Sequence, residues 1–422
     1  MQHLTTIVLL LTFSICQAQK PQSFTTATKP EQAGMSANRL SRIDKLIEDH
    51  IQREAIPGGV GLVIRDGKIV YYKAFGHSDA DKKIALKKDD IFRIASQSKA
   101  ITSLAVMILF EEGKFLLDDP ISRYIPEFKN PTVLKTFNTS DSLYTTEPAA
   151  GEITIRHLLT HTSGIDYAAI GSDKFKAIYA KAGIPSGIGT HQGVLGDKIK
   201  ALARLPLKHN PGKEWTYGLN NDVLGYLVEV VSGMTFNDFL QQRIFKPLGM
   251  KDTYFFVPAE KHNRVVSLYQ GKDGKAIKMQ TTAFDNVNPD YPKLQGSYYS
   301  GGAGLCSTIE DYAKFLQMFM NGGEFNNVRI LSRKTIELML TNQLHAPIDR
   351  QFGLGFGLET TGNDHSSIST IGTFEWGGAF NTDFWADPKE KLIGLFYTNI
   401  YQSPVWDITE KFKVLAYQAI ID

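Results

Sequence analysis

Ser96 and Lys99 are the residues of this 422-residue chain whose types and spacing most directly suggest chemistry. From Ser96 to Gly113 apolar side chains recur at helical spacing, which predicts an amphipathic helix. The apolar positions are Ile101, Leu104, Ala105, Ile108 and Leu109. Residues three apart share a helix face, so the Lys99 amine can reach the Ser96 hydroxyl. A hydroxyl with a base in reach is the arrangement of an activated nucleophile, and the unpaired N–H groups of a helix start can hold an oxyanion.

The Ser/Thr-x-x-Lys pattern also occurs at two other places in the chain. Thr26 lies in a polar stretch near the N-terminus, and Thr132 follows a proline in a loop. Only Ser96 opens a long apolar-striped segment. The helix therefore selects Ser96 as the candidate nucleophile.

The N-terminus has the composition of a secretory signal. An apolar run from Ile7 to Ile15 is followed by Cys16-Gln17-Ala18, which predicts residues 1–18 as a signal peptide and an exported, periplasmic or secreted protein. The run is too short to span a bilayer, so no transmembrane segment is expected. A lipid anchor at Cys16 is disfavoured because Phe13-Ser14-Ile15 lacks the small residues that such processing needs.

Composition argues for one catalytic domain over residues 19–422. The 46 basic and 44 acidic residues give a net charge of +2, which disfavours a nucleic-acid partner. No Pro/Gly/Ser-rich linker or repeat divides the chain. After removal of the signal, Cys306 is the only cysteine, so packing rather than an intrachain disulfide must stabilise the fold.

The remaining patterns predict the elements that position Ser96. Four segments have a helical pattern: they begin at Ser36, after Tyr217, at a Ser307/Glu310 capping box and near Trp406. Strand patterns lie on both sides of the Asp66-Gly67 turn and cover Phe374–Ala386 and Leu392–Thr398. This order predicts an α+β fold, an antiparallel sheet flanked by N- and C-terminal helices with a second, mostly helical lobe. The α/β lobe would comprise about 36–117 and 300–422, and the helical lobe about 118–299.

Longer segments carry a family resemblance. Gly113-Lys-Phe-Leu-Leu-Asp-Asp-Pro follows the Ser96 helix, Ile153-Thr-Ile-Arg-His-Leu-Leu-Thr-His-Thr-Ser-Gly comes next, and Trp376-Gly377-Gly378 lies in a late strand pattern. With the Ser-x-x-Lys pattern, these segments resemble the serine β-lactamase and penicillin-binding-protein-like superfamily, specifically the esterase-like subgroup related to class C β-lactamases. The resemblance implies a β-lactamase/transpeptidase-like fold and a serine acyl-enzyme.

Tyr217 matches the tyrosine of the superfamily's Tyr-x-Asn element. Leu219 stands where the lactamases have Asn, which implies that the side chain that normally contacts an acyl amide is missing at this position. Asn220 follows one position later and is a candidate substrate-binding residue in its place. A structural alternative for Tyr217 is a helix-entry tyrosine packed on Trp215.

Trp376-Gly377-Gly378 resembles the esterase form of the third element, which is Lys-Thr-Gly or His-Thr-Gly in other members. The tryptophan brings no positive charge for a substrate carboxylate, and the glycines let a substrate backbone approach the strand. The resemblance implies that the N–H groups of Ala379 and Ser96 form the oxyanion hole.

Two groups compete as the base for Ser96. Making Lys99 half neutral at pH 7 costs ~4.6 kcal/mol, and making Tyr217 half ionised costs ~4 kcal/mol, so these energies do not decide between them. The two groups are expected to titrate as a coupled pair. Our hypothesis is that Lys99 takes the Ser96 proton, and that Tyr217 relays it to the leaving group and activates water.

Other readings of the chain are weaker. His157 and His161 are spaced to share a metal on a helix, but no His-Glu-x-x-His occurs, so they are interpreted as structural, and no metal or cofactor is expected. No Gly-x-Ser-x-Gly supports an α/β-hydrolase. The sequence therefore predicts an exported serine hydrolase of small acyl esters or short peptides. A D-amino-acid peptidase or amidase, a β-lactamase and a non-enzymatic penicillin-binding-like sensor remain alternatives, and the sequence does not give the oligomeric state.

Overall fold

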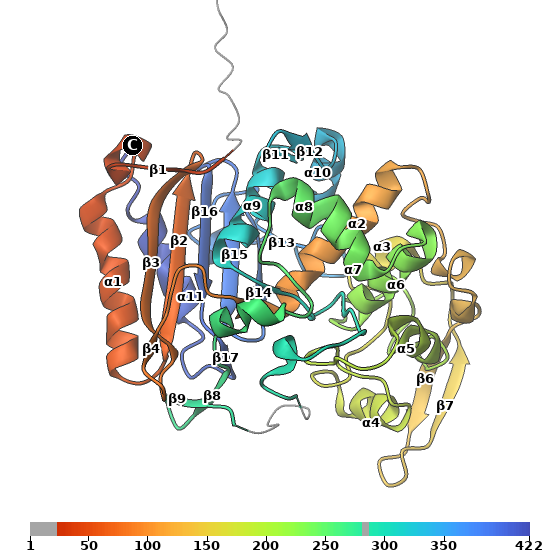
Figure 1. The fold of residues 1–422 in the computed structure, drawn as a ribbon. Coiled ribbons are helices and arrows are strands. Elements are labelled where there is room, and N and C mark those ends of the chain that lie inside the picture. Colours follow the sequence, from red (N-terminus) through yellow and green to blue (C-terminus); the bar gives the residue numbers. More distant parts are fainter. Residues whose placement is uncertain (1–22, 281–286) are drawn as a thin grey trace, which may run out of the picture.

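The computed structural model describes residues 23–280 and 287–422, so the expected signal peptide and Cys16 lie outside the described residues. An eight-stranded sheet lies at its centre, in the order β1-β3-β2-β16-β15-β14-β13 with β4 paired to β3 (Figure 1). Within this sheet of the described chain, β1 and β3 pair in parallel and every other pair is antiparallel. The strands are β1 (Thr25–Thr26), β2 (Gly58–Arg65), β3 (Lys68–Asp79), β4 (Ile84–Ala85), β13 (Gly357–Leu358), β14 (Phe374–Gly378), β15 (Thr382–Asp387) and β16 (Leu392–Tyr397).

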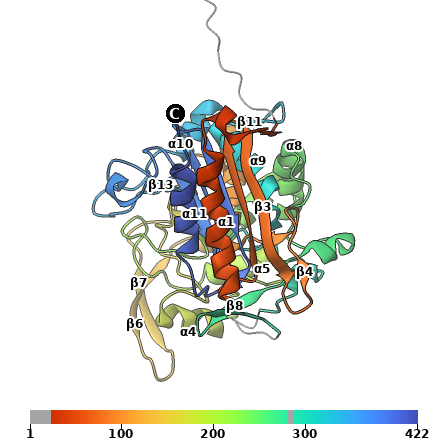
Figure 2. The same cartoon turned by 90° about the vertical axis from the view of Figure 1, so that its left-hand side faces the viewer.

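Both faces of the sheet are covered by helices. The terminal helices α1 (Ala37–Gln52) and α11 (Ile408–Tyr417) lie side by side on one face, and α9 (Ile309–Met320) packs on the other (Figure 2). Every residue of the central strands β2 and β16 is consequently buried. The predicted flanking of an antiparallel sheet by N- and C-terminal helices is confirmed.

The strand and helix predictions for the sheet lobe hold in most details. Asp66 and Gly67 have φ of 49° and 72°, as a two-residue hairpin turn between β2 and β3 requires. Ser36 caps α1 by accepting a hydrogen bond from the Arg39 N–H. The prediction of a single strand over Phe374–Ala386 is wrong: the segment is a hairpin of β14 and β15 that reverses at Asn381, whose φ is 54°.

The predicted cap of the helix that ends at Met320 is wrong by one residue. Thr308 caps α9 by accepting from the Asp311 N–H at 3.2 Å. Ser307 instead pairs in strand β10 (Cys306–Ser307), and its hydroxyl lies 2.7 Å from that of Thr253. Pairing with a neighbouring strand, which sequence alone did not indicate, therefore shifts the helix start.

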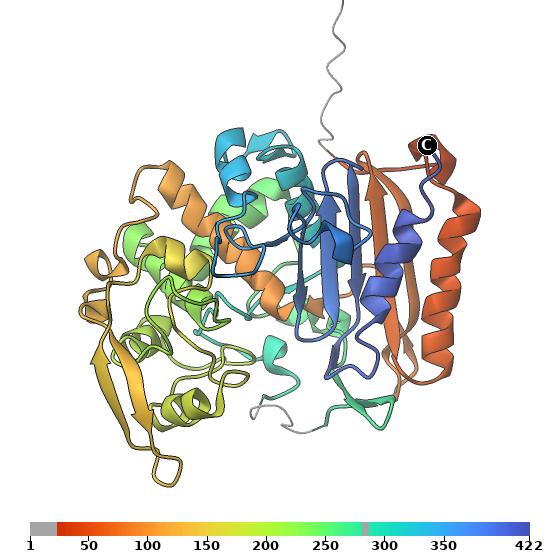
Figure 3. The same cartoon turned by 180° about the vertical axis from the view of Figure 1, so that it is seen from behind.

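The second lobe is mostly helical and lies beside the sheet (Figure 3). It also contains a β-hairpin that the sequence did not predict, β6 (Thr132–Phe137) with β7 (Tyr144–Pro148). Its other elements are α3 (Ile155–Leu159), α4 (Asp173–Lys181), α5 (Leu195–Leu202), α6 (Asn220–Ser232), α7 (Phe236–Leu240), a π-helical turn (Gln241–Phe245) and α8 (Lys246–Leu248). At the end of the main sheet, β8 (Tyr269–Lys272) pairs with β9 (Lys275–Lys278) and with β17 (Ile400–Tyr401), so the predicted helical-lobe boundary near residue 299 does not hold for these strands. The remaining elements outside the helical lobe are β5 (Phe92–Arg93), α2 (Ser98–Glu111), β11 (Glu324–Phe325), β12 (Val328–Arg329) and α10 (Arg333–Met339).

Helix α2 connects the two lobes and is more deeply buried than its sequence pattern suggested. Every residue from Ser98 to Leu109 is buried, so the helix has no solvent face along most of its length. It packs against α6 of the second lobe. In the described part of the chain no single helix is long and apolar enough to cross a membrane. The bent helix pair Asn220–Ser232 and Phe236–Leu248 would be long and apolar enough only if its two helices are counted together.

Candidate active site

The turn that carries Ser96 has a constrained backbone. Ala95 has a φ of 41°, a left-handed conformation that L-residues rarely adopt and that often marks functional sites. Ala95–Gln97 forms a 3₁₀ turn, and α2 begins only at Ser98, so Ser96 lies just before the α-helix rather than within its first turn. Ser96 is partly exposed although its neighbours on both sides are buried. The hydroxyl is therefore presented to solvent from an otherwise buried segment.

Polar side chains of the sheet lobe anchor this turn. The Tyr312 hydroxyl of α9 donates to the Gln97 carbonyl at 2.9 Å, and the Tyr397 hydroxyl of β16 donates to Gln97 Oε1 at 2.5 Å. Ser98 is fully buried, and its Oγ accepts the Leu305 N–H at 3.1 Å. Ser98 thus holds a loop in place.

Lys99 lies within hydrogen-bonding distance of Ser96. Its Nζ donates to Ser96 Oγ at 3.2 Å and to the Gly302 carbonyl at 2.7 Å, and the side chain is only 2% exposed. The ammonium also lies over the rings of Tyr217 and Tyr167, 4.5 and 5.4 Å from their centroids. The predicted contact between Lys99 and Ser96 is therefore present in the structure.

Strand pairing brings Gly302 to Lys99. β5 pairs with β10, and the Ile94 N–H donates to the Leu305 carbonyl at 3.1 Å, which holds residues 300–305 along the Ser96 turn. A Cβ at Gly302 would lie 2.7 Å from Asp222 Oδ2. The loop backbone therefore passes close to the Asp222 side chain, and any larger residue at position 302 would force that carboxylate to move.

Tyr217 stands in an aromatic group above Lys99. Its ring stacks on Trp215, with centroids 5.8 Å apart and planes at 16°, and lies 5.0 Å from His161 and 5.9 Å from Trp376. No hydrogen bond joins the Tyr217 hydroxyl to Ser96 or Lys99, so the contact with Lys99 is through the ring. Tyr217 both packs on Trp215 and lies close to Lys99. The structure is therefore compatible with a catalytic tyrosine and with a helix-entry tyrosine that packs on Trp215.

Asn220 is buried inside α6, and its side-chain amide is engaged by protein groups. Its Oδ1 accepts from Ser163 Oγ at 2.5 Å, and its Nδ2 lies 2.9 Å from His161 Nδ1. His161 in turn packs against the Tyr217 ring. Asn220 thus supports the aromatic group from behind, and its contact with an acyl amide stays a prediction.

The two histidines with helical spacing do not share a helix face. α3 ends at Leu159, so His157 lies on it and His161 lies beyond it with a φ of 57°. His157 accepts the Thr154 N–H in a capping box, and burial lowers the pKa of both imidazoles. Among the described residues no group of three or more His, Cys, Asp or Glu side chains has an arrangement that could hold a metal ion.

The end of β14 lies directly against the Ser96 turn. A Cβ at Gly378 would be 2.4 Å from the Ile94 carbonyl, so glycine is required here by the chain's own backbone. Trp376 is partly exposed and faces Tyr217, and Gly377 lines a cavity of about 320 Å³ with it. Ala379, just after β14, packs in an apolar cluster with Ala95 and Phe380. The structure brings Ser96 and residues 376–379 together.

Asp222 is a residue at this site that the sequence analysis missed. It lies 1% exposed on α6, with no hydrogen-bond partner in good geometry for either carboxylate oxygen, although Ser300 and the Gly302 backbone lie near it. Burial raises its pKa to about 6, against the opposing effect of the Lys99 charge. Its position five residues after Tyr217 did not indicate a place in the active site, because only tertiary packing puts Asp222 behind Lys99.

The structure also places a cation near Trp376, which itself brings no positive charge. The guanidinium of Arg350, on the loop between α10 and β13, lies 3.7 Å from the Trp215 ring centroid and 5.9 Å from that of Trp376. Nothing in the local sequence around Arg350 indicated this contact, since the loop comes from a distant part of the chain.

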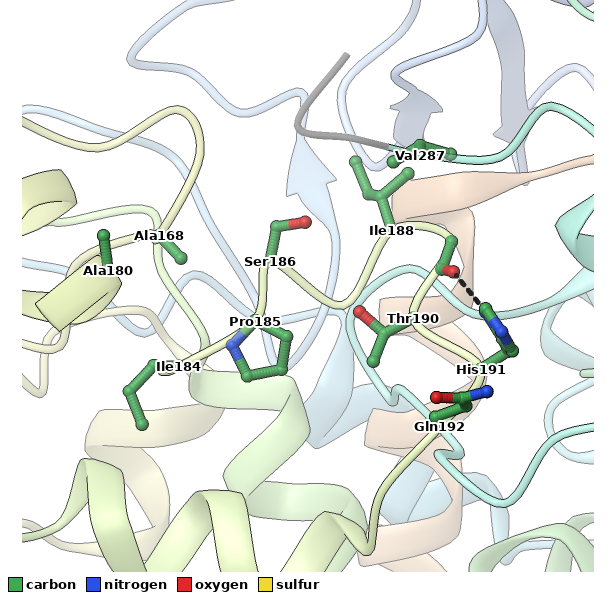
Figure 4. A pocket seen from close by; sticks show the side chains of 11 residues that line it. Ala168, Ala180, Ile184, Pro185, Ser186, Ile188, Thr190, His191, Gln192 and Val287 are labelled. Carbon is green, nitrogen blue, oxygen red and sulfur yellow. Dashed lines mark hydrogen bonds between the residues drawn. The ribbon is translucent and has the colours of Figure 1, made fainter. Parts of the chain in front are cut away.

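A second cavity, of about 350 Å³, lies in the helical lobe beside α4. Its wall includes Ile184, Ser186, Ile188 and Val287, and Ser96 does not line it (Figure 4). Ile188 and Val287 belong to the apolar cluster that also contains Ala95. This cavity therefore shares an apolar wall with the turn that carries Ser96.

Comparison with known proteins places nearly the whole chain in a family. The model of the family described as Beta-lactamase matches residues 43–418, nearly all of the described chain. The chain belongs to the Beta-lactamase family. Its antiparallel sheet with flanking helices and helical second lobe is the fold of that family's structural neighbours.

The proteins to which the chain is similar include an esterase and a hydrolase with acyltransferase activity. The chain is 30% identical over 378 residues to Esterase EstB of Burkholderia gladioli, covering 86% of this chain and 91% of the relative. It is similar to the structure of EstCE1, a hydrolase with promiscuous acyltransferase activity, at 25% identity and a TM-score of 0.78, covering 90% and 99% of the two chains. Simvastatin synthase (LovD) from Aspergillus terreus matches at 25% identity and a TM-score of 0.75, covering 90% and 98%. The protein is a serine hydrolase-type enzyme of acyl transfer.

Proposed function

We propose that the enzyme hydrolyses small acyl esters through an acyl-enzyme on Ser96, as a carboxylesterase-like relative of class C β-lactamases. One observation carries the proposal: the partly exposed Ser96 hydroxyl accepts a hydrogen bond from the buried Lys99 amine at 3.2 Å, below the Tyr217 ring. The similarity to Esterase EstB supports the ester as substrate.

The reaction has two balanced halves. Ser96 Oγ bonds to the acyl carbon while its proton passes to Lys99 and, through Tyr217, to the departing alcohol as the ester C–O bond breaks. The N–H groups of Ser96 and Ala379 stabilise the oxyanion. Water then attacks the acyl carbon, gives its proton to the Lys99–Tyr217 pair and releases the acid, and Ser96 regains its proton.

The surroundings of Ser96 favour an uncharged acyl group. The cluster around Ala95 consists of apolar side chains from both lobes: Ile188, Leu268, Met279, Val287, Tyr291, Ala303 and Phe380. Burying an ionised acyl group against such a surface is costly, whereas a short alkyl chain gains by leaving water. Acetyl and butyryl esters are therefore the substrates that we propose.

Side-by-side kcat/KM values on p-nitrophenyl butyrate, nitrocefin and a D-Ala-D-Ala peptide test the proposal. We expect the ester to react much faster than the other two substrates. Fastest turnover of nitrocefin would identify a β-lactamase, and fastest turnover of the peptide a D-peptidase. Stable labelling of Ser96 by a serine probe without turnover of any substrate would indicate a sensor.

We further propose that the enzyme acts outside the cytoplasm, after cleavage behind Ala18. The apolar run from Ile7 to Ile15 supports this location. N-terminal sequencing of the mature protein should begin at Gln19, and an intact Met1 would contradict export through this signal.

A further inference from the structure

His161 connects the aromatic group of the candidate active site to a buried hydrogen-bond network behind it. Its ring centroid lies 5.0 Å from that of Tyr217 and 5.8 Å from that of Trp215, and the residue is 1% exposed. Its carbonyl accepts the Thr216 N–H at 2.8 Å, so its main chain and its side chain both contact the segment that ends at Tyr217. His161 therefore limits where the Tyr217 ring can lie above Lys99.

The donors and acceptors of this network follow from one buried hydroxyl. The Ile165 N–H donates to Ser163 Oγ at 3.1 Å, and the Ser163 hydroxyl donates to Asn220 Oδ1 at 2.5 Å. The Nδ2 group of Asn220 then faces His161 Nδ1 at 2.9 Å. If the Asn220 amide were reversed, the fully buried Ser163 O–H would lose its acceptor, which is unfavourable for a buried donor. The amide is therefore oriented with its NH₂ group toward His161.

This orientation decides where the imidazole of His161 carries its proton. Nδ1 accepts the Asn220 N–H, so the proton of the neutral ring is on Nε2. A second proton on Nδ1 would set two donors against each other. Besides Tyr217, the charged groups that act on the ring are Lys99 and Arg350, and with burial they hold the pKa of His161 well below its ordinary value. Hydrogen bonding and charge therefore both oppose an imidazolium.

From this network we infer that His161 is a positioning residue for Tyr217, kept as a neutral imidazole with its proton on Nε2 by Ser163 and Asn220. The inference deepens the proposed ester hydrolysis and rests on it. When the nucleophilic serine gives up its proton, its lysine–tyrosine pair gains one positive charge. A cation on a ring 5.0 Å from that of Tyr217 would oppose this gain, whereas a neutral imidazole supports the tyrosine without opposing it.

Nitrogen NMR of the wild-type enzyme with isotopically labelled histidine tests the protonation directly. His161 should show a protonated Nε2 and a bare Nδ1, with no titration between about pH 5.5 and 9. His209 is the internal control, because its Nδ1 lies 2.9 Å from the Asn210 carbonyl and its Nε2 2.9 Å from the Thr216 hydroxyl, which requires the opposite tautomer of the neutral ring. The His161 signals are assigned by their loss in His161→Phe. A protonated Nδ1 or a titrating ring at His161 would overturn the inference.

Ser163→Ala tests the network without adding a charge. The variant removes the donor that orients the Asn220 amide, so the amide can reverse and accept from Nδ1. Protonation of His161 Nδ1 should then appear in the NMR spectrum, with the His209 signals unchanged. A His161 spectrum identical to wild type in this variant would overturn the role of Ser163.

Asn220→Asp tests the consequence for catalysis. The carboxylate accepts where the amide donated, so His161 should take up a proton on Nδ1 and titrate near neutral pH. Between pH 8 and pH 6 the kcat on p-nitrophenyl butyrate should fall about tenfold more than in wild type, with KM within twofold, and the midpoint should coincide with the NMR titration. Asn210→Asp is the matched control, since it adds a carboxylate beside His209 whose Nδ1 bonds only the main-chain carbonyl, and it should change neither profile nor His161 signals.

A double variant separates the imidazole from the new carboxylate. His161→Phe keeps an aromatic ring beside Tyr217, and in the Asn220→Asp background it should remove the extra loss of kcat below pH 8. A loss that persists without the imidazole, or an unchanged kcat profile in Asn220→Asp although His161 titrates, would overturn the inference. Absence of Ser96-dependent hydrolysis in the wild-type enzyme would instead refute the proposed function, and the NMR result would still judge the hydrogen-bond network.

Discussion

The floor and the rim of the site are built in different ways. The floor, the part of the site around Lys99, is buried and polar. Gly302 and Asp222, which belong to separate elements, lie close to each other and to Lys99 there. The rim around Trp215 is aromatic and partly exposed, and its cation, Arg350, makes no ion pair within the described residues. Groups that react must have a fixed geometry and a shielded charge, whereas groups that select a substrate must remain accessible to it. Under the proposed function, the floor would carry out the reaction and the rim would select the substrate.

The largest effect should come from the nucleophile itself. Ser96→Ala should abolish turnover and fluorophosphonate labelling with the fold retained, because no other floor residue offers the hydroxyl. Ser98→Ala is the matched control two positions away, and it should keep labelling. It should lower the free energy of unfolding by about 1–3 kcal/mol, since it leaves the buried Leu305 N–H unpaired. Labelling that persists in Ser96→Ala would contradict the assignment.

Loss of either proton-transfer partner should be the next largest effect. Lys99→Ala and Tyr217→Phe should each lower kcat by about 10² to 10⁴, the scale of general acid–base help. Their losses should not add, because one proton passes through both groups. A double variant as slow as the product of the single effects would show that the two residues act independently.

Asp222→Asn removes the ionisable group of this residue and keeps a side chain of similar size, so it should separate the effect of the Asp222 charge from the effect of its packing. The folded-state pKa of about 6 lies above the ordinary 3.8, so ionisation of Asp222 removes stability as pH rises from about 4 to 6. The two-unit difference corresponds to about 3 kcal/mol, and Asn should reduce the loss of unfolding free energy between pH 4 and 7 by up to that amount. Urea unfolding at the two pH values measures this change.

A control for this variant is Asp90→Asn. Burial also raises the pKa of Asp90 to about 6, and this residue caps the Lys87 N–H at 2.8 Å. It should change stability with pH in the same direction, but only Asp222→Asn should move the acidic limb of the kcat/KM profile, because its charge acts on Lys99. An identical profile for both variants would remove Asp222 from the functional floor.

The smallest expected effect is that of metal chelation. EDTA should leave ester hydrolysis unchanged, because the proposed steps use only Ser96, Lys99 and Tyr217. A loss of activity that zinc restores would give His157 or His161 a role that this mechanism does not contain.

The sequence by itself determined the local elements and the local pair. The three-residue spacing of Ser96 and Lys99 set their contact, and Asp66-Gly67 set the hairpin, because both depend on residues adjacent along the chain. The Ser-x-x-Lys pattern together with the segments that begin at Gly113, Ile153 and Trp376 was sufficient to predict the family. Patterns of this kind can be recognised from short stretches of neighbouring residues.

Tertiary structure alone decided what surrounds that pair. Asp222 lies behind Lys99 because α6 packs on α2, Gly302 reaches it through pairing of β5 with β10, and Arg350 covers Trp215 because Phe352 is buried nearby. These contacts join segments more than a hundred residues apart, and no local periodicity encodes such distances. Desolvation likewise depends on the whole fold, so the raised pKa of Asp222 and the free cation at the rim became visible only when the lobes were packed together.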